Sequence, residues 1–88
     1  MSENWTDEEL KAAVEAYLDM HAKEANGISF VKRDIYADLS SRFGRTEKSY
    51  EYRMQNISYV FSIMGRDWIS GLKPAKNVGS NTASTIER

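Results

Sequence analysis

Residues 31–65 read VKRDIYADLSSRFGRTEKSYEYRMQNISYVFSIMG, and this stretch decides the fold. Apolar side chains recur at every fourth position, which predicts a helix over about residues 31–43. Gly44 tolerates the left-handed backbone that ends a helix, and Thr46 is a favourable cap for the next one. Because only Arg45 lies between the stop and the cap, the two helices are expected to cross steeply, as in a helix-turn-helix.

A further helix is predicted upstream of this stretch. Thr6-Asp7-Glu8-Glu9 is a capping box, in which the threonine and the second glutamate satisfy free backbone N–H groups at the start of a helix. Apolar residues then recur at spacings of three and four as far as about Ala22, and Asn26-Gly27 turns the chain.

The last predicted element is a short turn that begins near Asp67. Its apolar residues Trp68, Ile69 and Leu72 are expected to cover the end of the core. We therefore expect an all-α, three-helix, helix-turn-helix-like bundle with a short fourth helical turn, in a domain of residues 1–76. The polar stretch 77–88 is expected to be a flexible tail or a linker, with a C-terminal effector domain as an open alternative.

The composition excludes several kinds of chemistry. The chain has 88 residues, no cysteine and a single histidine, His21, so it cannot form a disulfide framework or a thiolate metal site. We expect His21 to fill space beside aromatic side chains or to bond a carbonyl. No acid, base and nucleophile stand in a catalytic pattern, so we expect no enzyme activity, no metal and no cofactor.

The two ends of the domain differ in charge. Residues 1–28 carry a net charge of −5 and residues 29–76 a net charge of +4, within a total of −1. If the fold separates these segments, a basic surface results. The alternative is that the charges are ordinary solvated helix faces. The acidic start and the lack of a long apolar run predict no membrane partner and a protein of the cytoplasm or nucleoid.

The helix that follows Thr46 is the candidate recognition helix for double-stranded DNA. Its inward stripe is predicted to be Tyr50, Met54, Ile57, Phe61 and Met64, which leaves polar side chains on the flanks and outer face. Five cations are expected to anchor the phosphate backbone: Lys32, Arg33, Arg45, Lys48 and Lys73. Three side chains are expected to reach base edges: Arg53, Gln55 and Asn56. Ser49 and Tyr52 complete the candidate nucleic-acid-binding set.

Two alternatives stay open at this point. Arg53 would pair with an acid of the first helix, while Gln55 and Asn56 face water. Alternatively, the domain would be a protein-interaction module, in which the acidic first helix docks a basic partner or an exposed aromatic patch drives self-association. The sequence does not indicate the oligomeric state.

Two known groups share motifs with this chain. The broader likeness is to Myb/SANT-type domains, through Trp5-Thr6, Glu8-Glu9-Leu10, and Gly44-Arg45-Thr46 followed by Ser49 and Arg53. The closer one is to a helical domain at the N-terminus of bacterial HNH-type and other restriction-associated proteins. It rests above all on Gln55-Asn56-Ile57-Ser58 and Gly71-Leu72-Lys73-Pro74, within residues 5 to about 78. This resemblance implies a DNA-targeting module whose partner domain carries the nuclease chemistry.

Overall fold

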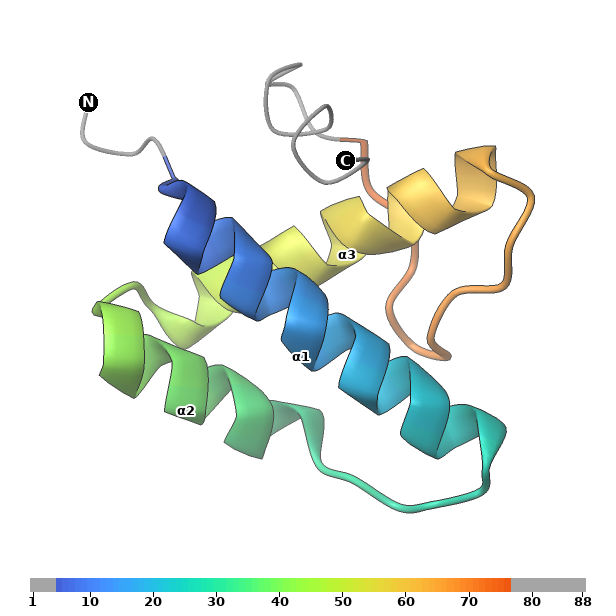
Figure 1. Cartoon of the computed structure of the whole chain (residues 1–88), viewed down its shortest axis with the longest axis horizontal. Helices are drawn as coiled ribbons and strands as arrows, with labels where there is room; N and C mark the ends of the chain where they lie inside the picture. The colour runs from blue at the N-terminus through green and yellow to red at the C-terminus, as the bar shows by residue number, and fades with distance from the viewer. Residues whose placement is uncertain (1–4, 77–88) are drawn as a thin grey trace.

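The computed structural model describes residues 5–76, which form three helices (Figure 1). They are α1 (Asp7–Ala25), α2 (Lys32–Phe43) and α3 (Glu47–Ile63), and each contacts the other two. Within the described part there is no strand. The predicted all-α, three-helix bundle is confirmed. No helix in this part combines the length and the apolar character needed to cross a membrane.

The capping box at the start of α1 forms as expected. Glu9 N donates to Thr6 Oγ1 at 3.1 Å, and Thr6 N donates to Glu9 Oε1 at 2.9 Å. At the other end α1 stops at Ala25, directly before Asn26-Gly27 as predicted, and the Asn26 side chain donates to the Ala22 carbonyl at 2.8 Å. The backbone N–H of Asn26 donates to the same carbonyl at 3.1 Å, so Asn26 closes the helix end with two hydrogen bonds.

The turn between α2 and α3 has the predicted length and chemistry. Gly44 adopts a left-handed φ of 84°, and its N–H donates to the Ser40 carbonyl at 2.7 Å. Thr46 then caps α3 by accepting from Ser49 N at 3.1 Å. The short connection holds the start of α3 close to the end of α2.

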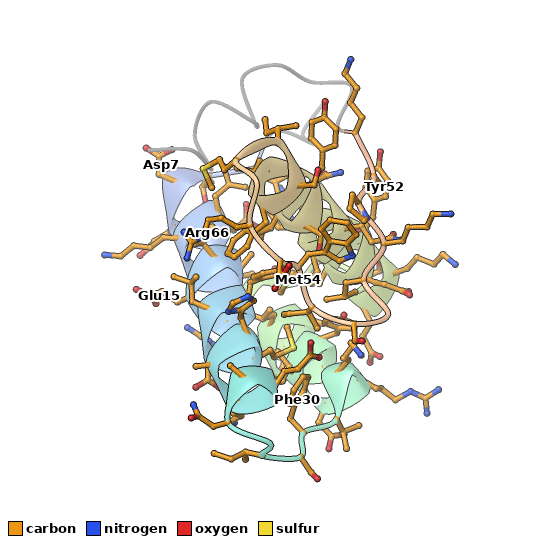
Figure 2. All side chains as sticks on the ribbon, turned by 90° about the vertical axis from the view of Figure 1, so that its right-hand side faces the viewer. Asp7, Glu15, Phe30, Tyr52, Met54 and Arg66 are labelled. Atoms are coloured by element: carbon orange, nitrogen blue, oxygen red, sulfur yellow. The ribbon has the colours of Figure 1, made fainter. Side chains whose placement is uncertain are left out.

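The core contains the predicted stripe of α3 except at its end. Tyr50, Met54, Ile57 and Phe61 are buried, whereas Met64 is 49% exposed because α3 ends at Ile63. Figure 2 shows Met54 in the interior, between the helices.

Residues 66–76, here called the strap, leave the end of α3 and return alongside it (Figure 1). Ile69 and Leu72 of the strap are buried in the core, as expected. The predicted fourth helical turn is a single hydrogen-bonded turn, from Leu72 N to the Ile69 carbonyl at 3.0 Å. Trp68 is 42% exposed, so the expectation that it covers the core is wrong. The expected tail, residues 77–88, lies outside the described residues.

One buried hydroxyl joins α1, α3 and the strap. Tyr17 OH of α1 lies 2.8 Å from Ser58 Oγ of α3 and accepts from Ile69 N of the strap at 3.1 Å. Tyr17 is fully buried, and this burial raises the pKa of its phenol. The strap is thus attached to the centre of the core by a specific hydrogen bond.

Removing this hydroxyl is predicted to destabilise the fold. Tyr17→Phe leaves Ser58 Oγ and Ile69 N without their partner, so the free energy of unfolding should fall by about 1–3 kcal/mol. Urea unfolding followed by circular dichroism measures the change. Tyr36→Phe is the matched control, because the buried Tyr36 hydroxyl has no partner among the described residues, and its loss should cost nothing. Equal stability losses in both variants would contradict this interpretation.

Candidate nucleic-acid interface

Arg45, a predicted phosphate anchor, is engaged inside the protein. Its Nε donates to Glu9 Oε2 at 2.9 Å and a terminal nitrogen donates to Glu9 Oε1 at 3.1 Å. The guanidinium also lies 4.3 Å from the centre of the Trp5 ring, and only 19% of the side chain is exposed. The connection between α2 and α3 therefore binds the start of α1, so the assignment of Arg45 to a phosphate is corrected.

The ion pair changes the titration of Glu9. Hydrogen bonds from Arg45 hold the pKa of this carboxyl below its ordinary value, although burial acts in the opposite direction. The same carboxylate caps α1, so one side chain serves both the helix start and the tertiary contact.

Arg53 is not presented on the outer face of α3. It is only 7% exposed, its guanidinium lies 4.3 Å from the centre of the Trp5 ring, and it donates to Asn56 Oδ1 at 3.3 Å. Burial, together with the nearby charge of Arg45, lowers its pKa. Both expectations for Arg53, a base contact and an ion pair with an acid of the first helix, are therefore wrong.

Asn56 is likewise buried, at 1% exposure. Its Nδ2 donates to the Ala75 carbonyl at 2.7 Å, and Ala75 N donates back to the Gln55 carbonyl at 3.1 Å. Asn56 thus ties the strap to α3 and is not available to a base edge. The expectation that it faces water is also wrong.

One of the two most specific motifs of the resemblance, Gln55-Asn56-Ile57-Ser58, makes these buried contacts, and the other, Gly71-Leu72-Lys73-Pro74, directly precedes the bonded Ala75. Ser58 binds Tyr17, and Asn56 binds the strap immediately after Pro74. Val60 is the sequence signal that indicates the burial of Arg53 and Asn56. It lies on the same side of α3 as these two residues and is also buried. An apolar residue at that spacing indicates a second buried face.

The remaining predicted anchors are accessible. Arg33, Lys48 and Lys73 are exposed and Lys32 is half-buried, and none forms an ion pair within the described part of the chain. Lys76 of the strap is also exposed. Its carbonyl accepts from the Tyr52 hydroxyl at 3.4 Å, which places it beside α3. Lys32, Arg33, Lys48 and the strap therefore surround the first turns of α3.

Three of these cations line a groove between α2, α3 and the strap. Its volume is about 370 Å³. The residues around it are Lys32, Arg33, Tyr36, Glu47, Lys48, Glu51, Gly71 and Leu72. The two carboxylates reduce its positive charge without removing it.

The other candidate residues of α3 differ in accessibility. Tyr52 is 45% exposed, whereas Ser49 and Gln55 are half-buried. The Ser49 hydroxyl lies 2.9 Å from Thr46 Oγ1, within the cap. Tyr52 and Lys48 are thus the α3 side chains from the candidate set that reach solvent most freely.

The fold separates the acids of α1 from this surface. Figure 2 shows Asp7 and Glu15 of α1 on one side of the molecule and Tyr52 of α3 on the opposite side. Asp7, Glu8, Glu15 and Asp19 are all exposed. The separation is partial, because Arg66 of the basic segment lies on the side of the α1 acids (Figure 2), and Glu47 and Glu51 stand among the lysines of the groove.

The predicted role of His21 is confirmed. Its Nε2 lies 3.1 Å from the Asp67 carbonyl oxygen, and its ring packs against Phe61 with centroids 5.2 Å apart. Among residues 5–76, no group of three or more metal-ligating side chains comes together.

Comparison of the chain with protein-family models, with curated proteins and with solved structures finds no match.

The burial of Asn56 leads to a stability prediction. Asn56→Ala removes the bond to Ala75 and leaves a carbonyl unpaired, so the free energy of unfolding should fall by about 1–3 kcal/mol. Gln55→Ala is the neighbouring control, because Gln55 contributes only its backbone carbonyl to the strap. Chemical denaturation of both variants measures the difference. A fully stable Asn56→Ala protein would show that the strap does not need this bond.

The Glu9–Arg45 pair leads to a pH prediction. Because folding lowers the Glu9 pKa below its ordinary value of 4.5, the unfolded chain binds more protons than the folded one as the pH falls below 4.5. The stabilisation is complete above that value and is lost below it. Glu9→Gln should therefore cost about 1–3 kcal/mol at neutral pH, and this cost should shrink in acid.

Urea unfolding at neutral pH and at several values below pH 4.5 tests this dependence. Glu15→Gln is the control, since Glu15 is exposed and has no hydrogen bond or ion pair within the described residues. A Glu9→Gln cost that stays constant with pH would refute the role given to the ion pair.

Proposed function

We propose that this domain binds double-stranded DNA, chiefly through the phosphate backbone. The observation that carries the proposal is the group of accessible cations around the first turns of α3, which have no ion pair within the described residues. They are Lys32, Arg33, Lys48, Lys73 and Lys76. Such a surface releases counterions when it meets a polyanion, which is the main source of sequence-independent affinity for DNA.

The separation of charge supports the same proposal. The exposed acids of α1 lie on the side away from Tyr52 of α3 (Figure 2), so they repel a polyanion from one surface and leave the other open. DNA approaching the basic side meets Lys48 on the first turn of α3 and the strap lysines beside it.

The burial of Arg53 and Asn56 limits how such a domain reads sequence. Both are withdrawn from the surface, so a base contact would have to come from exposed side chains such as Lys48 or Tyr52. We therefore propose binding that is tolerant of sequence and strongly dependent on salt. The resemblance to restriction-associated proteins adds the proposal that the domain delivers nuclease chemistry to DNA.

A second candidate function is the docking of a basic protein on α1. It is favoured by Leu18, which is 47% exposed on α1 beside the acid Asp19. A partner of this kind would leave the lysines around α3 without a role. The salt dependence of DNA binding distinguishes the two functions.

Neutralising one lysine is predicted to weaken DNA binding to all sequences alike. Lys48→Gln removes one phosphate contact, so the slope of log K against log salt should fall by about one unit. Fluorescence anisotropy with a labelled random-sequence duplex, titrated at several salt concentrations, measures the slope. Lys73→Gln/Lys76→Gln should lower it by about two units.

Lys11→Gln on the acidic helix α1 is the matched control, because it removes an exposed lysine from outside the proposed surface. Its slope should equal that of the unmodified protein. A duplex titration without any salt dependence, or equal effects of Lys11→Gln and Lys48→Gln, would exclude the proposal.

A further inference from the structure

One face of α3 carries a stripe of side chains outside the core. Its members follow one another at spacings of three and four, so they share one side of the helix: Lys48, Tyr52, Gln55, Tyr59 and Ile63. Tyr52 and Ile63 are 45% and 54% exposed, and Tyr59 is half-buried. This face, here called the aromatic stripe, therefore presents apolar surface to the solvent.

The strap holds the ring of Tyr52 in place. The Tyr52 hydroxyl donates to the Lys76 carbonyl at 3.4 Å, and Ala75 N donates to the Gln55 carbonyl at 3.1 Å. Because the hydroxyl already has a partner, the part of this side chain that remains for a ligand is its ring. A ring that is fixed before binding loses little conformational freedom when a ligand packs against it.

The charges next to Tyr52 are positive. Lys48 lies one turn earlier on the same face, and Lys76 lies beside Tyr52 on the strap. Both lysines are exposed and form no ion pair within the described residues. The nearby carboxylates, Glu47 and Glu51, line the groove toward α2. The aromatic stripe thus suits a ligand that carries negative charge beside flat apolar groups.

An unpaired DNA strand combines these two features, because each phosphate is followed by a base with a free face. In a duplex the neighbouring base pairs cover these faces, so a tyrosine ring meets them only where the strand is unpaired. Tyr52 and Tyr59 are two turns apart, about 10 Å along the helix axis. This is the rise of about three stacked nucleotides, so one strand lying along α3 meets both rings.

We propose that the aromatic stripe binds single-stranded DNA by stacking unpaired bases on Tyr52 and Tyr59, while Lys48 and Lys76 hold the flanking phosphates. The inference rests on the proposed function, because it uses part of the same basic surface, and it adds a base contact to the phosphate contacts. A duplex makes the phosphate contacts alone, whereas a single strand makes both kinds.

The test compares three labelled probes of equal length by fluorescence anisotropy with the whole chain. They are an oligothymidylate, a strand of abasic sites and a random-sequence duplex, all at the same salt concentration. The abasic strand has the phosphates of the oligothymidylate without its bases. We expect the oligothymidylate to bind about tenfold more tightly than the abasic strand. Equal affinities for these two strands would overturn the proposal.

Variants of the two tyrosines examine the stacking contact. Tyr52→Leu and Tyr59→Leu keep an apolar side chain and remove the ring, so each should weaken oligothymidylate binding about tenfold and leave the abasic strand and the duplex unchanged. Tyr52→Phe keeps the ring and loses only the bond to Lys76, so it should retain the affinity. Equal losses for the oligothymidylate and the duplex would show a structural role and would refute stacking.

Trp68→Leu is the matched control. Trp68 is an aromatic residue of similar exposure, but it lies beside His21 and Glu24 of α1, outside the aromatic stripe. Its replacement should leave oligothymidylate binding unchanged. Equal losses in Trp68→Leu and Tyr52→Leu would contradict the assignment of the site to α3.

The failure of this inference is distinguishable from the failure of the proposed function. If the duplex and the abasic strand bind with salt dependence and the bases add no affinity, stacking is refuted and DNA binding is retained. If only the oligothymidylate binds, the stacking site is retained and the duplex function is refuted. If no probe binds, both are refuted.

Discussion

The hydroxyl of Tyr17 is the contact on which the rest of this fold depends. It bonds to Ser58 and to Ile69, so a single buried atom holds together α1, α3 and the strap. Such hydrogen bonds stabilise the fold, because Ser58 Oγ and Ile69 N would otherwise be buried without a partner. Because Ile69 is fixed there, Leu72 enters the core three residues later and the strap returns toward α3.

The return of the strap determines what α3 offers to a partner. Asn56 bonds to Ala75, and Tyr52 bonds to Lys76, so the strap covers part of the helix that would face solvent in a bare three-helix bundle. Arg53 and Asn56 are consequently structural. The exposed strap lysines Lys73 and Lys76 are added to Lys48 and Tyr52 of α3 as accessible polar groups.

The positive charges near the start of α1 also serve the fold. Trp5 contacts the guanidinium groups of Arg45 and Arg53, each 4.3 Å from the ring centre, and packs edge-on against Tyr50. Contacts between guanidinium groups and an indole ring are favourable when they are shielded from water. Glu9 compensates the charge of Arg45. Arg45 and Arg53 of the basic segment therefore help to hold the start of α1 against α3 and the connection that precedes it.

Local sequence signals determined the secondary structure of this protein. The capping box at Thr6, the glycine stop at Gly44 and the cap at Thr46 each act through backbone groups within a few residues, so they could be read directly from the chain. The apolar spacing of four likewise defined α2 and the principal inward face of α3. These signals need no knowledge of distant residues.

Only the tertiary structure decided which charged and polar residues are available to a partner. Arg45 donates hydrogen bonds to Glu9, which lies 36 positions away in the sequence, and Asn56 donates to the carbonyl of Ala75, which lies 19 positions away. A guanidinium or a carboxamide has the same chemistry at a DNA surface and in a core contact, so residue type alone cannot separate the two uses. Long-range packing determines which of these side chains are buried. A polar group near an apolar surface is buried when a hydrogen-bond partner satisfies it, and it stays in water when no partner is present.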